Sequence, residues 1–479
     1  MADPSAQAAA AMEQILRQLQ STNNQQRNDA EAAFNSAKQR PGPCMEALCI
    51  LATSSQDEIV RATAAVLLRR SASELWEGSS DPTKLLIKQK LLQGIRSEPS
   101  AANRKKLCDT ISVLGAGAAG SDGWPELFPF LFELSKSPVA HERESALYIF
   151  SQLTTYVSSD LEPYLPTLHA MFRSALGDSD QSVRLAGLKA TCGVLNTVES
   201  SKCAAFEDLI PLMLHPISES LNMQDEESAR QSIELLIEVI ETEPRFWRNH
   251  LASVTNAMLT IASTTALEEG TRQLGLEFLV SASEKLPAAC RKLPNFIQNV
   301  IPVALSMMLE LEDDAEWYNK DDDDDDNVEY SNFDAGQESL DRLAISLGGK
   351  LVLPVVFTII PQFLANEPSW VHRHAGLLAI SQIGEGCERQ IENQLGSVIQ
   401  MALQRFVDPH PRVRWAAINC IGQMCTDFGP RIQREFHAQI VPALIHVMDD
   451  TANARVQSHA AAAVINFCDE ATPEIIGPY

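Results

Sequence analysis

The stretch DPHPRVRWAAINCIGQMCTDFG, residues 408–429, decides the fold because residues 178–195, DSDQSVRLAGLKATCGVL, repeat its pattern. Both place an acidic turn before Val-Arg, continue with small residues and then bring a cysteine into a segment with helical periodicity. The shared arginines are Arg184 and Arg414. A pattern that returns far along a chain is typical of a protein assembled from copies of one structural unit.

Arginine marks the same place in the other copies of the unit. Successive copies are 39–46 residues apart, except for one gap of 101 residues after Arg272, in which we expect Arg342 to occupy the repeat position. A second amphipathic segment, often with a proline, precedes each copy. Two helices joined by a short acidic turn in about 40 residues are the periodicity of a HEAT repeat. The marking arginines are Arg61, Arg104, Arg143, Arg184, Arg230, Arg272, Arg373, Arg414 and Arg455.

The repeat predicts an all-α fold, a right-handed superhelical solenoid of about eleven HEAT repeats built from antiparallel helix pairs, without a β-sheet. One helix pair cannot bury its apolar face alone, so each copy must repeat the residues that contact its neighbours. We expect the acids of each turn to cap the following helix and the arginine to link adjacent turns through carboxylates. Small residues after the arginine should let helices approach closely, and they include Ala186, Gly187, Ala416, Ala417, Ala460 and Ala461.

Composition limits the classes of function. A net charge of −25 on 479 residues disfavours a nucleic-acid partner, because binding phosphates requires a basic surface, and it favours basic protein partners. The longest apolar runs, such as residues 350–365, are too short and too interrupted to cross a membrane, and the N-terminus lacks the pattern of a secretory leader. The ten cysteines form no CxxC pair. We expect a soluble intracellular protein whose cysteines are small buried apolar residues, rather than disulfide or zinc ligands.

An acidic insert interrupts the eighth unit. Residues 312–329 contain eleven acids and one lysine, so the segment repels itself. It is either a solvated loop that improves solubility or a docking strip for a basic protein surface, with Trp317, Tyr318, Tyr330 and Phe333 available for packing against the partner. It lacks the spaced ligands and central glycine of a calcium-binding loop. The candidate partner-binding residues are Asp321, Asp322, Asp323, Asp324, Asp325 and Asp326.

Sequence signatures of catalysis are missing. The chain has no phosphate-binding loop, dinucleotide fingerprint, GxSxG or HExxH pattern. His372 and His374 are two residues apart and therefore fall on different faces of a helix, which does not suit a metal pair. We predict that the protein is not an enzyme and that it uses no metal or cofactor.

Several phrases together resemble the importin-β (karyopherin-β) superfamily, and within it the N-terminal half of a karyopherin-β3 type nuclear import receptor. The phrases follow the family order across the chain, and the acidic insert falls within the eighth repeat. Family members are about twice as long, and we expect this chain to be a truncated portion of one. The phrases include RATAAVLLRR (61–70), WPELFPFLFEL (124–134), ESLDRLAISLGGKLVLPVV (338–356), RHAGLLAISQIGEGC (373–387) and RVQSHAAAAVINF (455–467).

The resemblance implies a receptor that binds basic cargo in the cytoplasm, passes through the nuclear pore and releases cargo in the nucleus on binding Ran-GTP. It implies that second helices line the inner face, that repeats one to four offer these helices to Ran-GTP, including residues 61–70, and that Phe-Gly nucleoporins contact grooves between outer helices. It also implies shuttling between cytoplasm and nucleus, with no membrane partner. The alternative from another class is a HEAT scaffold subunit of a stable complex, which would have no use for Ran or for a long acidic insert.

A row of polar residues follows the repeat in the last part of the chain. Glu385, Asp427 and Asn466 step by 42 and 39 residues, and Asp341 extends the row into the eighth unit. Each of them taken singly also fits a solvent-facing or capping role at a helix end. Resemblance to the karyopherin-β3 type implies that these positions hold lysines of a nuclear localisation signal, and lysine suits carboxylates and amides because it donates three hydrogen bonds.

These assignments divide the chain into four parts. Residues 1–200 are N-terminal repeats with the Ran-binding region, and residues 201–311 are central repeats. Residues 312–336 form the acidic insert. Residues 337–479 carry repeats with the cargo-binding row and end within the array.

Overall fold

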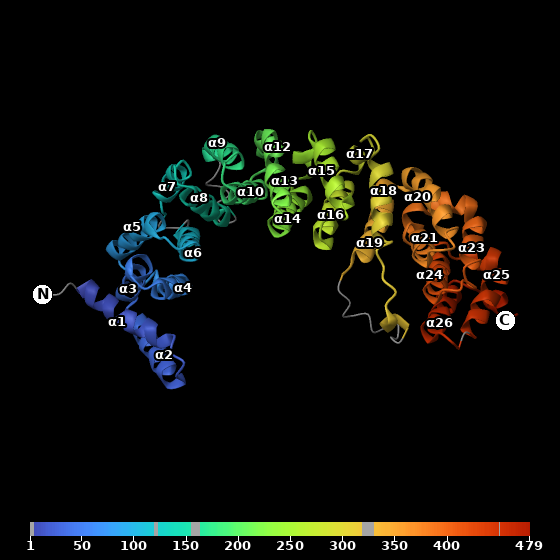
Figure 1. The fold of residues 1–479 in the computed structure, drawn as a ribbon, viewed down its shortest axis with the longest axis horizontal. Coiled ribbons are helices and arrows are strands. Elements are labelled where there is room, and N and C mark those ends of the chain that lie inside the picture. The colour runs from blue at the N-terminus through green and yellow to red at the C-terminus, as the bar shows by residue number, and fades with distance from the viewer. Residues whose placement is uncertain (1–3, 119–122, 155–162, 319–329, 450) are drawn as a thin grey trace. The chain divides into compact units, whose positions relative to one another are not determined.

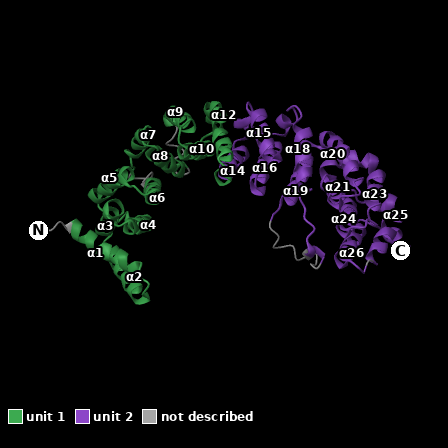
Figure 2. Ribbon diagram, viewed as in Figure 1, with its two compact units in different colours: residues 1–228 green, residues 229–479 purple. Residues whose placement is uncertain are grey.

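The computed structural model describes residues 4–118, 123–154, 163–318, 330–449 and 451–479, and within these ranges the regular elements are helices, with no strand (Figure 1). The all-α prediction is therefore confirmed. The chain divides into two compact units, residues 1–228 (unit 1) and 229–479 (unit 2), coloured separately in Figure 2. We call the first helix of each pair the A helix and the second the B helix.

Unit 1 contains, over its described residues, five consecutive helix pairs and then a broken A segment. The A helices are α1 (Pro4–Leu19), α3 (Pro41–Ser54), α5 (Asp81–Ser97), α7 (Leu127–Leu134) and α9 (Leu165–Leu176). The B helices are α2 (Asn24–Lys38), α4 (Glu58–Leu75), α6 (Ala101–Ala118), α8 (Ala140–Leu153) and α10 (Gln181–Leu195). The broken segment consists of α11 (Ser200–Cys203), η2 (Ala204–Leu209), α12 (Ile210–Met213) and α13 (His215–Asn222).

Unit 2 begins within the B helix α14 (Glu226–Thr242) and continues with five pairs over its described residues. The A segments are η3 (Pro244–Trp247) with α15 (Leu251–Ser263), α17 (Pro287–Cys290) with α18 (Phe296–Met307), α20 (Gly349–Leu364), α22 (Gly384–Ile391) with η6 (Glu392–Gln394) and α23 (Leu395–Leu403), and α25 (Arg431–Met448). The B helices are α16 (Glu269–Lys285), α19 (Asn332–Leu347), α21 (Trp370–Gln382), α24 (Pro411–Asp427) and α26 (Ala454–Asp469). Two short helices, η4 (Ala315–Tyr318) and α27 (Pro473–Ile476), complete the unit.

Small residues bring neighbouring helices into close contact, as the repeat predicts. Ala416 and Ala417 on α24 are fully buried, and α24 packs against both α21 and α26. A side chain added at Gly187 on α10 would place its first carbon 2.8 Å from Cβ of Ala175 on α9. Ala186 and Ala461 are only partly buried, and the adjacent residues Gly187 and Ala460 are the ones buried between the helices.

Ion pairs between an arginine of one repeat and a carboxylate in the turn of the next, which we call rungs, connect successive repeats within each unit. Arg373 on α21 donates to both carboxylate oxygens of Asp408 in the next turn, at 2.7 and 2.9 Å, and the Asp408 side chain is fully buried. Arg143 binds Asp178 in the same bidentate way at 2.7 and 2.8 Å. Arg61 and Arg272 make the same link to glutamates, Glu98 and Glu310. The predicted link is confirmed for these four arginines, although the acceptor is not always aspartate.

Arginines at this position also bind the turn that precedes their own helix. Arg143 donates to the carbonyl oxygen of Ser137, six residues earlier, at 2.9 Å, and Arg61 does so to Ser55 at 2.9 Å. Arg414 donates to the carbonyl of Asp408 at 2.8 Å. These carbonyls lie in the turns between the paired helices, where helical partners are missing. The recurring arginine therefore donates to a free carbonyl of the turn before its own helix and, in the cases above, also binds a carboxylate of the next turn.

Two predicted members of the arginine register are wrong. Helix α19 begins at Asn332, so Arg342 lies late in the helix, where it binds Glu277 and Glu284 of α16 at 2.8–3.0 Å rather than a turn carboxylate. Arg455 is the second residue of α26 and corresponds to Arg412 of α24, because Arg414 is the fourth residue of its helix. For Arg342, the long insert changes the interval between repeats, so counting residues does not give the repeat position. For Arg455, the residue is an arginine at the expected interval, but it occupies a different position in its helix.

The cysteines behave as the sequence predicts. All ten are free, nine are buried and Cys468 is partly buried. Burial raises the pKa of the Cys49 thiol to about 12, so this group is protonated at neutral pH. Within the described residues, no helix is both long and apolar enough to span a membrane.

Candidate functional site

Three acids of the predicted row come together on unit 2. Asp341 lies on α19, Glu385 lies at the start of α22 directly after α21, and Asp427 is the last residue of α24. Two glycines make the approach possible. A side chain at Gly386 would clash with the backbone of Ala344 on α19, and one at Gly384 would clash with a carboxylate oxygen of Asp427. Helix α22 therefore packs tightly between α19 and α24, with Glu385 flanked by these two contacts.

The electrostatics of the row favour a cation. Burial raises the pKa of Asp427 to about 6, a hydrogen bond from Gln423 lowers it, and the charges of Glu385, Asp341 and Glu388 raise it again. Burial also raises the pKa of Asp341, and the charge of Glu385 raises it further. Neighbouring carboxylates that oppose one another's ionisation produce a negative potential that a bound ammonium group would relieve.

Asn466 continues the row on the next B helix. It is exposed on α26, and a side chain at Gly422 of α24 would lie 3.6 Å from its amide nitrogen. The neighbouring Ile465 is 62% exposed, and Ile345, one turn after Asp341, is 50% exposed. The row therefore offers acids and an amide beside apolar side chains. Its assignment to cargo binding stays a prediction.

Helix α24 supplies further polar groups that the sequence reasoning missed. Gln423 donates to Asp427 at 2.8 Å. Asn419 lies one turn before Gln423 and interacts with His459 of α26 at 3.3 Å, and the ring of His459 stacks on Trp415 at 4.4 Å. Trp415, Asn419, Gln423 and Asp427 are spaced by four residues, so they occupy one helix face. This spacing was the available sequence signal.

The acidic insert is placed in part. The predicted partner-binding residues Asp321, Asp322, Asp323, Asp324, Asp325 and Asp326 lie outside the described residues. Trp317, which we expected to await a partner, already packs within the chain against the guanidinium groups of Arg412 and Arg455. Tyr330 is 54% exposed and donates to Glu338 at 2.9 Å. Phe333 lies in α19 with its ring 5.6 Å from that of His374.

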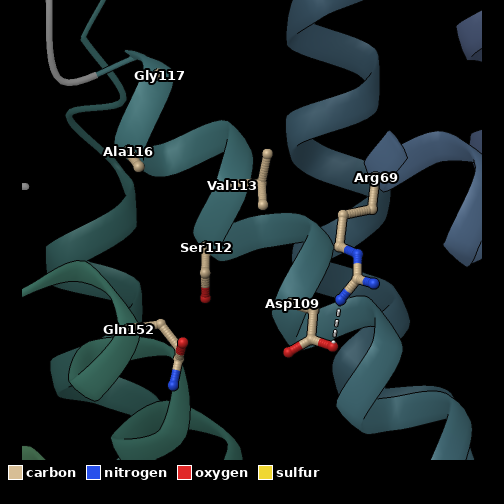
Figure 3. Close-up of a pocket in the computed structure, with 7 residues that line it drawn as sticks. All are labelled: Arg69, Asp109, Ser112, Val113, Ala116, Gly117 and Gln152. Atoms are coloured by element: carbon tan, nitrogen blue, oxygen red, sulfur yellow. Dashed lines mark hydrogen bonds and ion pairs between the residues drawn. The ribbon is translucent and has the colours of Figure 1, made fainter. Parts of the chain in front are cut away.

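Unit 1 has a depression on its B helices. A cavity of about 400 Å³ is lined by Arg69 of α4, by residues of α6 that include Asp109 and Ser112, and by Gln152 of α8 (Figure 3). Arg69 binds Asp109 at 2.9 Å, and the hydroxyl of Tyr148 donates to the other Asp109 oxygen at 2.7 Å. Arg69 belongs to the predicted segment 61–70, whereas Arg61 at its start is a structural rung. Within this segment, Arg69 lines the cavity, whereas Arg61 links two turns.

Metal chemistry finds no support in the described part of the chain. No group of three or more His, Cys, Asp or Glu residues there is arranged to hold a metal ion. His372 and His374 have separate environments, because the His372 ring packs on Phe363 and the His374 ring packs edge-on against Trp370.

Comparisons with known proteins agree with this architecture. Residues 99–257 match the family model for IPO5-like TPR repeats, residues 264–354 match the importin repeat and residues 398–428 match the HEAT repeat. Importin subunit beta-3 of Saccharomyces cerevisiae is 31% identical over 488 residues, a match that covers 97% of this chain and 44% of the relative. The chain thus spans less than half the length of that relative.

Solved structures of Kap121p are similar along nearly the whole chain. The structure of Kap121p bound to Ste12p has a TM-score of 0.86 at 30% identity, and the structure bound to Nup53p has a TM-score of 0.85 at 30% identity; each match covers 99% of this chain and 46% of the other. The structure of Kap121p bound to RanGTP has a TM-score of 0.84 at 31% identity with the same coverage. With its importin-type repeats, its stacked helix pairs and its similarity to importin subunit beta-3, the chain belongs to the importin-β family.

Proposed function

We propose that the chain is the cargo-binding and Ran-binding portion of a nuclear transport receptor that shuttles between cytoplasm and nucleus and acts without catalysis. The observation that carries the proposal is the convergence of Asp341, Glu385 and Asp427 on three neighbouring segments of unit 2, together with family membership. A scaffold subunit has no need to collect mutually repelling acids on its surface, because each repulsion destabilises the fold.

The row is suited to lysines of a basic localisation signal. An ammonium group donates three hydrogen bonds and relieves the repulsion between the carboxylates it contacts. Asp427 is half-buried and Asp341 is partly buried, so their charges are screened less than fully exposed ones. Each partly desolvated charge-assisted hydrogen bond would contribute about 1–3 kcal/mol. Asn466 supplies an amide oxygen at the end of the row.

Ran-GTP is the proposed partner of unit 1. The proposal rests on the similarity to Kap121p, which has been solved bound to RanGTP, and on the cavity across α4, α6 and α8. Arg69 and Asp109 present both signs of charge at this cavity, and Val113 is 43% exposed. Asp321–Asp326 would add a long-range attraction for a basic surface on Ran or on cargo.

Nucleoporins are proposed to bind between outer helices. Kap121p has been solved bound to Nup53p. In unit 1, a cavity of about 660 Å³ is lined by residues of α5 and α7 and of the turn that follows α7, among them Arg96, Pro129 and Phe132. Proline and phenylalanine at a groove between A helices suit a phenylalanine side chain from a Phe-Gly repeat.

Calorimetry with a lysine-containing signal peptide tests the cargo proposal. We expect Glu385→Ala with Asp427→Ala to lose binding while the melting temperature is retained. Glu392→Ala with Glu435→Ala is the matched control, because it removes two exposed acids from the A side of the same unit and should bind as the wild type does. Wild-type affinity in the first double variant would remove the row from the cargo site and favour the scaffold alternative.

A further inference from the structure

The segment Leu311–Tyr318, which we call the tie, lies along unit 2 instead of extending away from it (Figure 1). Its Trp317 ring receives the guanidinium of Arg412 at 5.2 Å and that of Arg455 at 4.9 Å. Arg412 in turn lies 5.2 Å from the ring of Trp370, which stacks on His410 at 4.2 Å with nearly parallel planes. The result is a continuous stack in which Arg455 and Arg412 alternate with Trp317 and Trp370, and the His410 ring lies at its end.

Backbone and charge contacts hold the tie in place as well. Arg412 donates to the carbonyl oxygen of Glu312 at 2.6 Å, and Arg455 donates to that of Trp317 at 3.4 Å. Asp313 lies 3.6 Å from His410 and accepts the hydroxyl of Tyr318 at 2.8 Å. Arg412 and Arg455 are only 7% and 6% exposed. Buried arginines require partners, and the tie supplies the Trp317 ring to both and one carbonyl oxygen to each.

The contacts of the tie join residues that are much farther apart in the sequence than those joined by the rungs. Rungs such as Arg373–Asp408 join residues 35 positions apart, which are neighbours in the stack. The tie joins Glu312 to Arg412, 100 positions away, and Trp317 to Arg455, 138 positions away. In a stacked-repeat protein each repeat otherwise contacts only its neighbours, so the spacing of distant repeats is the sum of small local adjustments.

Two helices that the tie contacts, α24 and α26, carry members of the acidic row. The tie follows Glu310, which accepts a hydrogen bond at 2.8 Å from Asn332 at the start of α19, the helix that holds Asp341. It reaches Trp370 on α21 only through Arg412, and α21 ends just before Glu385. It contacts Arg412 at the start of α24, which ends at Asp427, and Arg455 at the start of α26, which holds Asn466. The tie contacts the first turns of α24 and α26 directly and that of α21 through Arg412, whereas Glu385, Asp427 and Asn466 lie toward or beyond the opposite ends of these helices.

We propose that the tie is a positioning element that fixes the spacing of the B helices bearing the acidic row, with Trp317 as its central positioning residue. This inference rests on the proposed function of the row. Without the tie, the four row positions vary in separation and a peptide with several lysines must order them when it binds. A site that loses preorganisation in this way binds about 3- to 10-fold more weakly.

The experiment measures the spacing and the affinity separately in the full chain. Spin labels at Ile345→Cys and Ile465→Cys, both exposed positions beside the row, report the separation of α19 and α26 in a Cys468→Ser background. We expect Trp317→Ala to broaden or shift the distance distribution and to weaken binding of a lysine-containing peptide. Trp317→Phe keeps an aromatic face for the two arginines and should restore both properties.

The control is Tyr330→Ala, an aromatic residue on the other side of the insert that takes no part in the stack. It should leave the distance distribution and the affinity unchanged. An unchanged distribution in Trp317→Ala overturns the proposal, whatever the peptide does. If the wild-type chain binds no lysine peptide while Trp317→Ala still alters the distribution, the tie stands and the cargo function fails.

Discussion

Titration of Asp427 should make lysine-peptide binding depend on pH between pH 5 and 7. The pKa of this carboxyl is raised to about 6, first by burial and then by Glu385, Asp341 and Glu388, against the lowering effect of Gln423. At pH 7.5 nearly all of the chains carry the charged form, and at pH 5.5 about three-quarters are protonated. An ammonium that binds only the carboxylate should therefore lose about fourfold in apparent affinity over this interval.

Calorimetry at constant ionic strength measures the effect with a peptide that contains lysine but no His, Asp or Glu. Asp427→Asn is the decisive variant, because it keeps the oxygen that accepts from Gln423 but cannot ionise. It should bind more weakly at pH 7.5 and show a smaller change down to pH 5.5. Asp341, whose pKa is also raised, contributes in the same direction.

The nearby His459 interacts with Asn419 on the same face of α24, so His459→Gln serves as a control that should leave the pH dependence unchanged. A full fourfold loss that persists in Asp427→Asn would assign the pH dependence to another group and refute the reasoning. A wild-type affinity that stays flat from pH 7.5 to 5.5 would show that the carboxyl is not shifted or that it does not contact the peptide.

Three further outcomes follow from packing and charge. Arg373→Ala leaves the Asp408 carboxylate buried without its main partner, so urea unfolding should show a loss of about 3–5 kcal/mol for unit 2, and Arg373→Lys should recover part of it. Ala416→Leu should overpack the interface of α24 and destabilise it by about 1–3 kcal/mol in a thermal melt, whereas a leucine at the exposed position 465 should not. Replacing Asp321–Asp326 with serines should weaken binding of a basic partner more at low salt than at high salt, and equal affinity at low salt would leave the run as a solubilising loop.

The sequence predicts the stacked pairs well because the fold repeats one local rule. Arginine, acidic turn and small residues recur at each interface, and the rungs at Arg143 and Arg373 follow from that rule. The register fails for Arg342, because the insert before α19 removes the fixed interval on which the prediction depends. It also fails for Arg455, which is an arginine at the expected interval but is the second residue of its helix, whereas Arg414 is the fourth residue of its own.

The candidate site is predictable in part for the same reason. Glu385, Asp427 and Asn466 follow the repeat interval, so their alignment can be read along the chain. The contact of Trp317 with Arg455 cannot be read in this way, because it bridges 138 positions through a segment that belongs to no repeat. The remaining signal is that Arg412 and Arg455 share the second position of their helices. Both arginines are buried, and both contact the ring of Trp317.

The nearest-neighbour character of the rungs has a consequence for how such a chain changes over evolutionary time. Since Arg143, Arg373 and their counterparts hold only the adjoining turn, a whole repeat can be gained or lost elsewhere in the array without disturbing the remaining links. Within the tied region, by contrast, an added repeat between α19 and α26 would leave Trp317 facing the wrong helix. The array as a whole is free to vary in length, and the stretch from residue 311 to residue 466 is expected to keep a constant number of repeats.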